Sequence, residues 1–147
     1  MVGTNDPLRK KAILAARFCV ESLFRHKGRI PGKMAGEGLD CVGLVLYVGR
    51  QIGYVMEDWP YYTAVPRPGQ LESAAREAGL QPVARDHLKP GDIVLIRPGR
   101  HVQHAGILTE RGLIHADARL GRVVEQSLSA FDAGQITHHF RYPVLGD

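Results

Sequence analysis

The amino-acid sequence predicts an α+β fold in which helices come first and an antiparallel sheet follows. Apolar residues in the first half recur at helical spacing, whereas the second half holds short β-branched runs separated by turn residues. The chain has 147 residues, of which 44% are hydrophobic and 23% charged. This length and composition fit a single domain, 1–147, with a helical half over about 1–80 and a strand-rich half over about 81–147.

The first half predicts three helices, over residues 6–23, about 40–51 and 71–78. Asp6 can cap the first helix, and the proline that follows it suits a first turn because its missing N–H costs nothing there. The second helix carries little polar surface, so we expect it to be buried, and Gly53 ends it.

Two loops separate these helices. Residues 26–39 hold four glycines and one proline, so an irregular loop is expected. Residues 54–68 form a loop rich in aromatic side chains and prolines. Its Trp59, Tyr61 and Tyr62 are expected in the core by default, although they could instead form a wall for a substrate.

The second half predicts a sheet built from short strands. A turn at Lys89-Pro90-Gly91-Asp92 precedes the first of them. The expected strands are 93–97, 104–109, 113–116, 123–125 and 136–142. Helices followed by strands joined through short turns indicate an α+β arrangement with an antiparallel sheet.

Cys41 is the first candidate for chemistry, because it follows a glycine-rich loop and begins the second predicted helix. A helix N-terminus offers unpaired N–H groups and partial positive charge, which lower a thiol pKa and can bind an oxyanion. A lone cysteine is also commonly a small buried hydrophobe, so both interpretations stay open on this segment alone. Cys19 lies on the apolar stripe of the first helix and is expected to be inert.

His104 and His115 are candidates for a base and its partner. A nucleophilic thiol needs a base within hydrogen-bond reach, and the unperturbed pKa of histidine suits that task. A hairpin centred on Thr109-Glu110 places His115 opposite His104, and one centred on Glu110-Arg111 places it on a diagonal at about 7–8 Å. Both registers put the imidazoles on one face, whereas a three-residue loop changes the facing unless a bulge restores it. Alone, His104 could be an exposed loop residue, and His115 would be interpreted as a satisfied histidine in a strand.

The residues around Cys41 suggest contacts with a substrate. Asp40 could bind a positive group such as a free amine, and it could equally serve as the cap of the helix. Gly43 would let a substrate backbone approach closely, since it has no side chain.

Composition excludes several other classes. The formal net charge is +4, but there is no run of Lys and Arg with interleaved aromatics, so nucleic-acid binding is not expected. No apolar stretch suits a membrane span or a signal peptide, so we expect no membrane insertion and synthesis in the cytoplasm. Only two cysteines are present, which argues against a disulfide framework.

Four segments in order resemble the NlpC-type peptidases, a papain-like family that cuts peptide stems of bacterial peptidoglycan. They are Asp40-Cys41-Val42-Gly43-Leu44-Val45, then Leu88-Lys89-Pro90-Gly91-Asp92-Ile93-Val94, then His104-Ala105-Gly106-Ile107, and Ile114-His115-Ala116. The segment Phe24-Arg25-His26-Lys27-Gly28-Arg29 is similar to members encoded in phage tail and gene-transfer-agent modules.

The resemblance implies a reduced papain-like fold with the nucleophile helix packed on an antiparallel sheet. It implies Cys41 as nucleophile, His104 as base and His115 as the third, orienting member, with no cofactor or metal. The implied substrate is the bond between D-glutamate, through its γ-carboxyl, and a diamino acid in the stem peptide. Partners would be peptidoglycan and phage-like tail or hub proteins, with the enzyme carried in such a particle to act on the wall.

Two residues depart from the family pattern. Val42 stands where the family usually has Ser, and Phe24 stands where it usually has an aromatic residue with a hydroxyl. Both positions belong to the implied substrate-binding set with Asp40 and Gly43, so substrate preference is expected to differ here.

Two other functions remain open. The chain could be a non-catalytic papain-like component of a phage-like particle. It could also be a zinc-binding module, with ligands drawn from His101, His104, His115, His138, His139 and Cys41.

Overall fold

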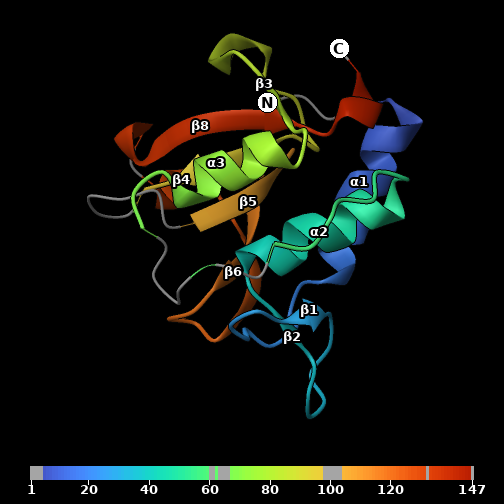
Figure 1. Cartoon of the computed structure of the whole chain (residues 1–147), viewed down its shortest axis with the longest axis vertical. Coiled ribbons are helices and arrows are strands. Elements are labelled where there is room, and N and C mark those ends of the chain that lie inside the picture. The colour runs from blue at the N-terminus through green and yellow to red at the C-terminus, as the bar shows by residue number, and fades with distance from the viewer. Residues whose placement is uncertain (1–4, 60–61, 63–66, 98–103, 132, 147) are drawn as a thin grey trace.

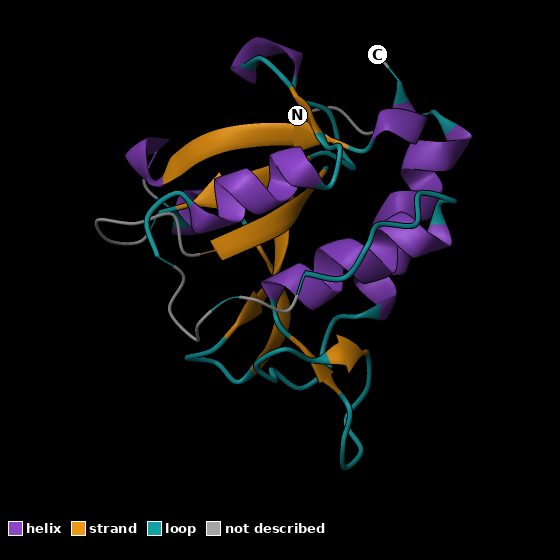
Figure 2. Cartoon of the chain, in the orientation of Figure 1, coloured by secondary structure: helices purple, strands orange, loops and turns teal. Residues whose placement is uncertain are grey.

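The computed structural model describes residues 5–59, 62, 67–97, 104–131 and 133–146. A six-stranded sheet dominates it, with strand order β3-β8-β4-β5-β6-β7 and antiparallel pairing throughout. The strands are β3 Gln81–Pro82, β4 Ile93–Ile96, β5 His104–Thr109, β6 Gly112–Asp117, β7 Arg122–Gln126 and β8 Ile136–Arg141. Figures 1 and 2 show the helices gathered beside this sheet, so the predicted α+β class is confirmed.

Three α-helices precede the sheet in the described part of the chain: α1 Pro7–Phe18, α2 Cys41–Gln51 and α3 Gln70–Glu77. Asp6 caps α1 as predicted, because its carboxylate accepts hydrogen bonds from two backbone N–H groups of the first turn, at 2.9 and 3.2 Å. Within the described residues, none of the helices combines the length and apolar character that crossing a lipid bilayer requires.

Helix α1 ends earlier than its apolar stripe predicts. The chain after Phe18 turns, with Glu21 at a φ of 73°, and then runs along the edge of β7. There Glu21 donates its backbone N–H to the Val123 carbonyl, and the Val123 N–H bonds the Ser22 carbonyl, both at 2.9 Å. Pairing with the sheet edge therefore replaces the last turn of the predicted helix.

The segment that was expected to be an irregular loop contains a small ribbon, β1 Arg29–Ile30 paired with β2 Gly38–Leu39. Its glycines let it lie tightly against the start of α2. A Cβ on Gly28 would come within 2.3 Å of the Gly38 carbonyl oxygen, and one on Gly43 within 2.0 Å of the Gly28 carbonyl oxygen. The glycines predicted an irregular loop, but in the structure they allow backbone segments to pack closely.

Helix α2 packs its apolar face on the sheet. Leu44 and Val48 of α2 are fully buried in the same core as Ile107 of β5 and Ile114 of β6. The side chain of Tyr142, just after β8, donates a hydrogen bond from its hydroxyl to a backbone carbonyl of α2, over 2.7 Å. The expected packing of the Cys41 helix on an antiparallel sheet is therefore confirmed.

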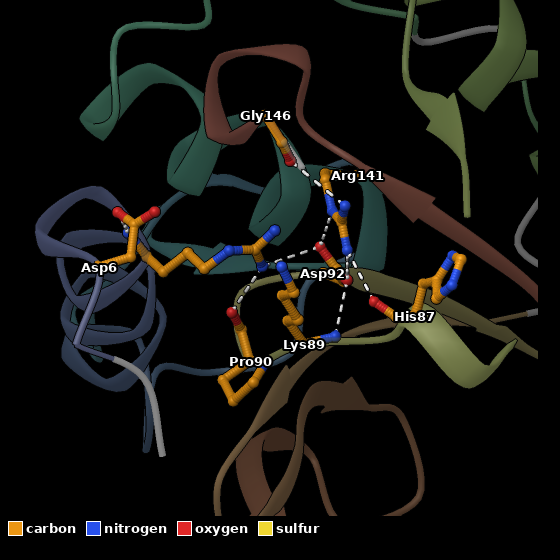
Figure 3. Close-up of polar contacts among 8 residues, drawn as sticks. Asp6, His87, Lys89, Pro90, Asp92, Arg141 and Gly146 are labelled. Atoms are coloured by element: carbon orange, nitrogen blue, oxygen red, sulfur yellow. Dashed lines mark hydrogen bonds and ion pairs between the residues drawn. The ribbon is translucent and has the colours of Figure 1, made fainter. Parts of the chain in front are cut away.

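A buried carboxylate ties the first helix to the sheet (Figure 3). Asp92 Oδ1 accepts from Arg9 Nη1 of α1 at 3.1 Å and from Arg141 Nε of β8 at 2.9 Å. Its Oδ2 accepts from Arg141 Nη2 and from the Lys89 backbone N–H, both at 2.9 Å. The predicted turn at residues 89–92 thus serves as the junction between α1, β4 and β8.

Candidate active site

Cys41 is the first residue of α2, and only 8% of its surface is exposed. The backbone N–H groups of Ala105, Val42 and Cys41 itself favour the thiolate and so act to lower the thiol pKa. Burial acts in the opposite direction more strongly, and the nearby Asp40 charge adds to it, so the thiol pKa is raised to about 12. The expectation of a lowered thiol pKa is therefore wrong for the free protein, because desolvation outweighs the helix N-terminus.

His104 and His115 meet on one face of the β5–β6 hairpin. Thr109 pairs with Gly112 around a two-residue turn, and Gly106 pairs with His115. This is the register centred on Glu110-Arg111, so the two histidines lie on a diagonal. Their rings approach edge to face, and His104 Nε2 lies 2.7 Å from His115 Nδ1.

A third side chain completes this hydrogen-bonded chain. His115 Nε2 lies 2.6 Å from Oε1 of Gln126, which belongs to the neighbouring strand β7. An amide oxygen only accepts, so His115 carries its proton on Nε2 and its Nδ1 accepts from His104 Nε2–H. His104 therefore keeps its lone pair on Nδ1, which is the form a general base requires.

Burial keeps both imidazoles neutral. It lowers the His104 pKa to about 3, and the neighbouring His115 lowers it further, while Asp117 acts in the opposite direction. Burial also lowers the pKa of His115, which is only 2% exposed. The Phe131 ring covers His115 edge-on, with ring centres 5.3 Å apart. At neutral pH the pair is thus uncharged and its tautomers are fixed by Gln126.

The two halves of the site adjoin each other at the start of β5. Ala105, whose backbone N–H favours the Cys41 thiolate, is the residue directly after His104. Ala105 and Cys41 also line the same pocket. The fold thus brings a thiol at a helix N-terminus beside a histidine–histidine–glutamine chain, an arrangement suited to nucleophilic attack with proton transfer.

This arrangement agrees with a comparison of the sequence with known families. A profile of the NlpC/P60 family matches residues 22–141 of this chain, which is most of its length. The chain belongs to the NlpC/P60 family. The predicted NlpC-type resemblance is therefore confirmed, whereas membership of the phage-tail subgroup remains a prediction.

Solved NlpC/P60 structures share the fold. The P60 domain of an antigen from Mycobacterium avium subspecies paratuberculosis superposes with a TM-score of 0.62 and 18% identity, covering 92% of this chain and 94% of that one. The peptidoglycan hydrolase RipB from Mycobacterium tuberculosis superposes with a TM-score of 0.61 and 20% identity, covering 92% of this chain and 64% of RipB. At these identities the likeness concerns the fold alone.

One NlpC/P60 neighbour is described as non-catalytic. RipD from Mycobacterium tuberculosis, a protein adapted to peptidoglycan binding, superposes with a TM-score of 0.59 and 15% identity, covering 91% of this chain and 95% of RipD. The fold therefore occurs with and without catalysis, and only the site can distinguish the two. A comparison with curated protein sequences found no match.

Asp40 lies at the centre of a hydrogen-bond network beside the NlpC/P60 cysteine. It caps α2, since Oδ1 accepts from the Gly43 N–H at 2.9 Å, and it also accepts from Arg29 Nη1 at 3.0 Å. Its Oδ2 accepts from the Lys27 N–H at 2.7 Å and from the Tyr62 hydroxyl. Four protein donors thus engage the carboxylate, and the predicted capping role is confirmed. Binding of a substrate amine by Asp40 stays a prediction.

The other predicted substrate-binding residues have different surroundings. Val42 lies in the first turn of α2, is half-buried, and lines the pocket that contains the Cys41 thiol. Phe24 is also half-buried, packs against the core and pairs its backbone with that of Leu39. Gly43 faces the chain's own backbone at Gly28, which corrects the expectation that a substrate backbone would approach it.

Sequence reasoning missed Gln126 and Arg29 as parts of the site. It expected Tyr62 to be buried, but it did not predict the contacts of Tyr62 with Arg29 and Asp40. Arg29 contacts Asp40, Asp58 and Tyr62, and the last contact spans 2.9 Å from Nη2 to the hydroxyl oxygen. The aromatic cluster at positions 59–62 was the one available signal. Its Trp59 and Tyr62 stack at 5.6 Å between ring centres, while Tyr61 lies outside the described residues.

The described residues contain no cluster of side chains that would support the zinc-binding alternative. No group of three or more His, Cys, Asp or Glu side chains there is placed to hold a metal ion. His104 and His115 bond each other, and His138 Nε2 bonds Glu72 at 3.1 Å. His101, another candidate ligand, lies outside the described residues.

Proposed function

We propose that this chain is a cysteine peptidase that hydrolyses stem peptides of bacterial peptidoglycan. Cys41 is the nucleophile, His104 the general base and His115 the residue that orients it. The observation that carries the proposal is the hydrogen-bonded chain from Gln126 through His115 to His104, which leaves His104 Nδ1 unprotonated. Ala105, the residue directly after His104, lines the same pocket as Cys41.

The proposed reaction is acyl transfer. His104 Nδ1 takes the Cys41 thiol proton as the sulfur attacks the amide carbon, and N–H groups at the start of α2 stabilise the oxyanion. The C–N bond then breaks, and His104 returns the proton to the leaving amine. Water, deprotonated by the same nitrogen, attacks the thioester and releases the acid together with free Cys41.

Proton transfer in this scheme accompanies substrate attack. Because the Cys41 pKa is raised to about 12 and the His104 pKa lowered to about 3, the free enzyme holds a neutral thiol and a neutral imidazole. A thiolate–imidazolium pair would form only as the negative charge moves to the substrate oxygen. This favours low thiol reactivity in the absence of substrate.

The proposed bond joins the γ-carboxyl of D-glutamate to a diamino acid. Membership of the NlpC/P60 family and the description of RipB as a peptidoglycan hydrolase support this substrate class. Carriage in a phage-like tail, after synthesis in the cytoplasm, is also a proposal, supported by the similarity of residues 24–29 to tail-module members.

A non-catalytic role is the second candidate. RipD provides a precedent for the fold, and Val42 and Phe24 depart from the usual family residues. The hydrogen bond between His104 and His115, together with Cys41 in the pocket that Ala105 also lines, favours catalysis over this alternative.

Mass spectrometry of muropeptides incubated with the protein tests the proposal. The wild-type protein should yield new fragments whose masses correspond to cleavage after D-glutamate, and Cys41→Ala should yield none. Intact muropeptides with both proteins, while the peptides still bind, would favour the non-catalytic role.

A further inference from the structure

An apolar pocket opens from the Cys41 thiol into the space between α2, α3 and the sheet. It holds about 510 Å³ of empty space, including its open mouth. Its walls are Val42 and Leu46 of α2, Ala74 of α3 and Ala78 just after that helix, and Leu95 of β4. The two alanines, one helical turn apart, leave the room that longer side chains on α3 would fill.

One charged side chain lines this pocket. Among the described lining residues Glu57 alone carries a charge, and it lies in the segment between α2 and α3 together with Trp59. Glu57 is exposed at the surface, whereas the Cys41 end of the pocket is buried. The pocket therefore offers an apolar passage from the nucleophile with a carboxylate at its outer part.

This combination suits a long aliphatic side chain that ends in a cation. The apolar walls would bury methylene groups, and the carboxylate would pair with the terminal charge. A side chain ending in a carboxylate would meet repulsion from Glu57, and a short side chain would leave the pocket unfilled.

Of the two residues that flank the proposed scissile bond, only one fits. D-glutamate, linked through its γ-carboxyl, presents its α-carboxylate, which Glu57 would repel. The diamino acid presents methylene groups and an ammonium. We propose that the pocket between α2 and α3 binds the side chain of the diamino acid and that Glu57 selects its terminal ammonium. This inference rests on the proposed function for the identity of the substrate.

Peptide binding to a variant that cannot cleave its substrate tests the inference separately from the proposed function. Trp59 is the single tryptophan of the chain and lines the pocket, so its fluorescence reports occupancy. Cys41→Ala would be titrated with an L-Ala-γ-D-Glu-L-Lys peptide and with the same peptide carrying norleucine, which keeps the methylene groups without the ammonium.

The lysine peptide should bind roughly 1.5- to fivefold more tightly than the norleucine peptide, as expected for an exposed ion pair. Adding Glu57→Gln should remove this preference by weakening only the lysine peptide. Glu77→Gln, an exposed glutamate on α3 outside the pocket lining, is the matched control and should keep it. Equal affinities in Cys41→Ala, or an unchanged preference with Glu57→Gln, would overturn the inference.

A steric variant tests the pocket independently of charge. Ala74→Leu should fill the space and weaken both peptides, while a peptide with alanine in place of lysine should bind as before. Unchanged lysine-peptide binding by a folded Ala74→Leu protein would overturn the placement of the side chain. If the wild type cleaves stem peptides but Cys41→Ala binds the lysine and norleucine peptides equally, the proposed function stands and the inference fails. If Cys41→Ala prefers the lysine peptide but the wild type cleaves no stem peptide, the inference stands and the proposed function fails.

Discussion

His115 Nδ1 accepts a hydrogen bond from His104 Nε2 over 2.7 Å, and this contact fixes which nitrogen of His104 can act as a base. The direction follows from Gln126, whose Oε1 lies 2.6 Å from the other nitrogen of His115 and can only accept. Three strands, β5, β6 and β7, each contribute one member. The orientation of His104 is therefore set by the sheet itself.

Gln126→Leu should lower kcat about tenfold to a hundredfold and leave KM nearly unchanged, because His115 loses the acceptor that fixes its tautomer. Steady-state kinetics on a stem peptide would measure this. Gln126→Glu should restore activity in part and move the acidic limb of the pH–rate profile upward, since a carboxylate favours protonated His115. Gln81→Leu, an exposed glutamine on β3, should behave as wild type. Equal kinetics for Gln126→Leu and Gln81→Leu would contradict the relay.

Arg29→Gln should make the Cys41 thiol less reactive. The Asp40 charge raises the Cys41 pKa, and Arg29, 3.0 Å from Asp40 Oδ1, offsets that charge. Alkylation by iodoacetamide should be about two- to tenfold slower at pH 8, with the apparent pKa shifted upward. Arg85→Gln changes the charge equally at an exposed site and should leave the rate unaltered. Faster alkylation of Arg29→Gln would contradict the conclusion that Arg29 offsets the effect of the Asp40 charge on the Cys41 thiol.

Stability should fall as the pH decreases from about 7 toward 3. The unfolded chain protonates His104 near its ordinary pKa of about 6.5, whereas the folded chain resists protonation until about 3. Burial acts on His115 in the same direction. Wild type should lose on the order of 1 kcal/mol of unfolding free energy between pH 7 and 5, after allowing for solvent at the partly exposed His104. Urea denaturation of His104→Asn should show a smaller loss, and an identical loss would contradict this account.

Asp92→Ala should destabilise the fold by about 3–5 kcal/mol, because it removes a buried carboxylate that both Arg9 and Arg141 contact. Asp86→Ala, an exposed aspartate in the preceding segment, should change stability by less than about 0.5 kcal/mol. Urea denaturation of both variants would measure the difference. Similar midpoints for the two variants would show that the junction contributes little.

Local signals predicted the start of each major helix and the strands that carry the histidines. Asp6 and Asp40 cap α1 and α2 because capping depends on residues within one turn. The strand 104–109 was predicted with its observed bounds, since β-branched and apolar residues between turn signals are a local pattern.

Features set by distant contacts were not predictable. Two hairpin registers were compatible with the sequence, and the observed one places Gly112 where a Cβ would lie 2.0 Å from the Gln126 carbonyl oxygen of β7. Gln126 joins the site because β7 pairs with β6, which no local pattern encodes. The contact between Tyr62 and Asp40 likewise joins residues 22 positions apart in the sequence, which no local pattern encodes.

The rate of cleavage of one defined stem peptide by three proteins tests the central claim most directly. Cys41→Ala should lose at least about a thousandfold in kcat/KM relative to wild type, since it removes the proposed nucleophile. Cys19→Ala, which alters the other, inert cysteine in the core, should stay within about twofold of wild type. Cleavage by Cys41→Ala at a rate near that of wild type would contradict the assignment of Cys41 as the nucleophile.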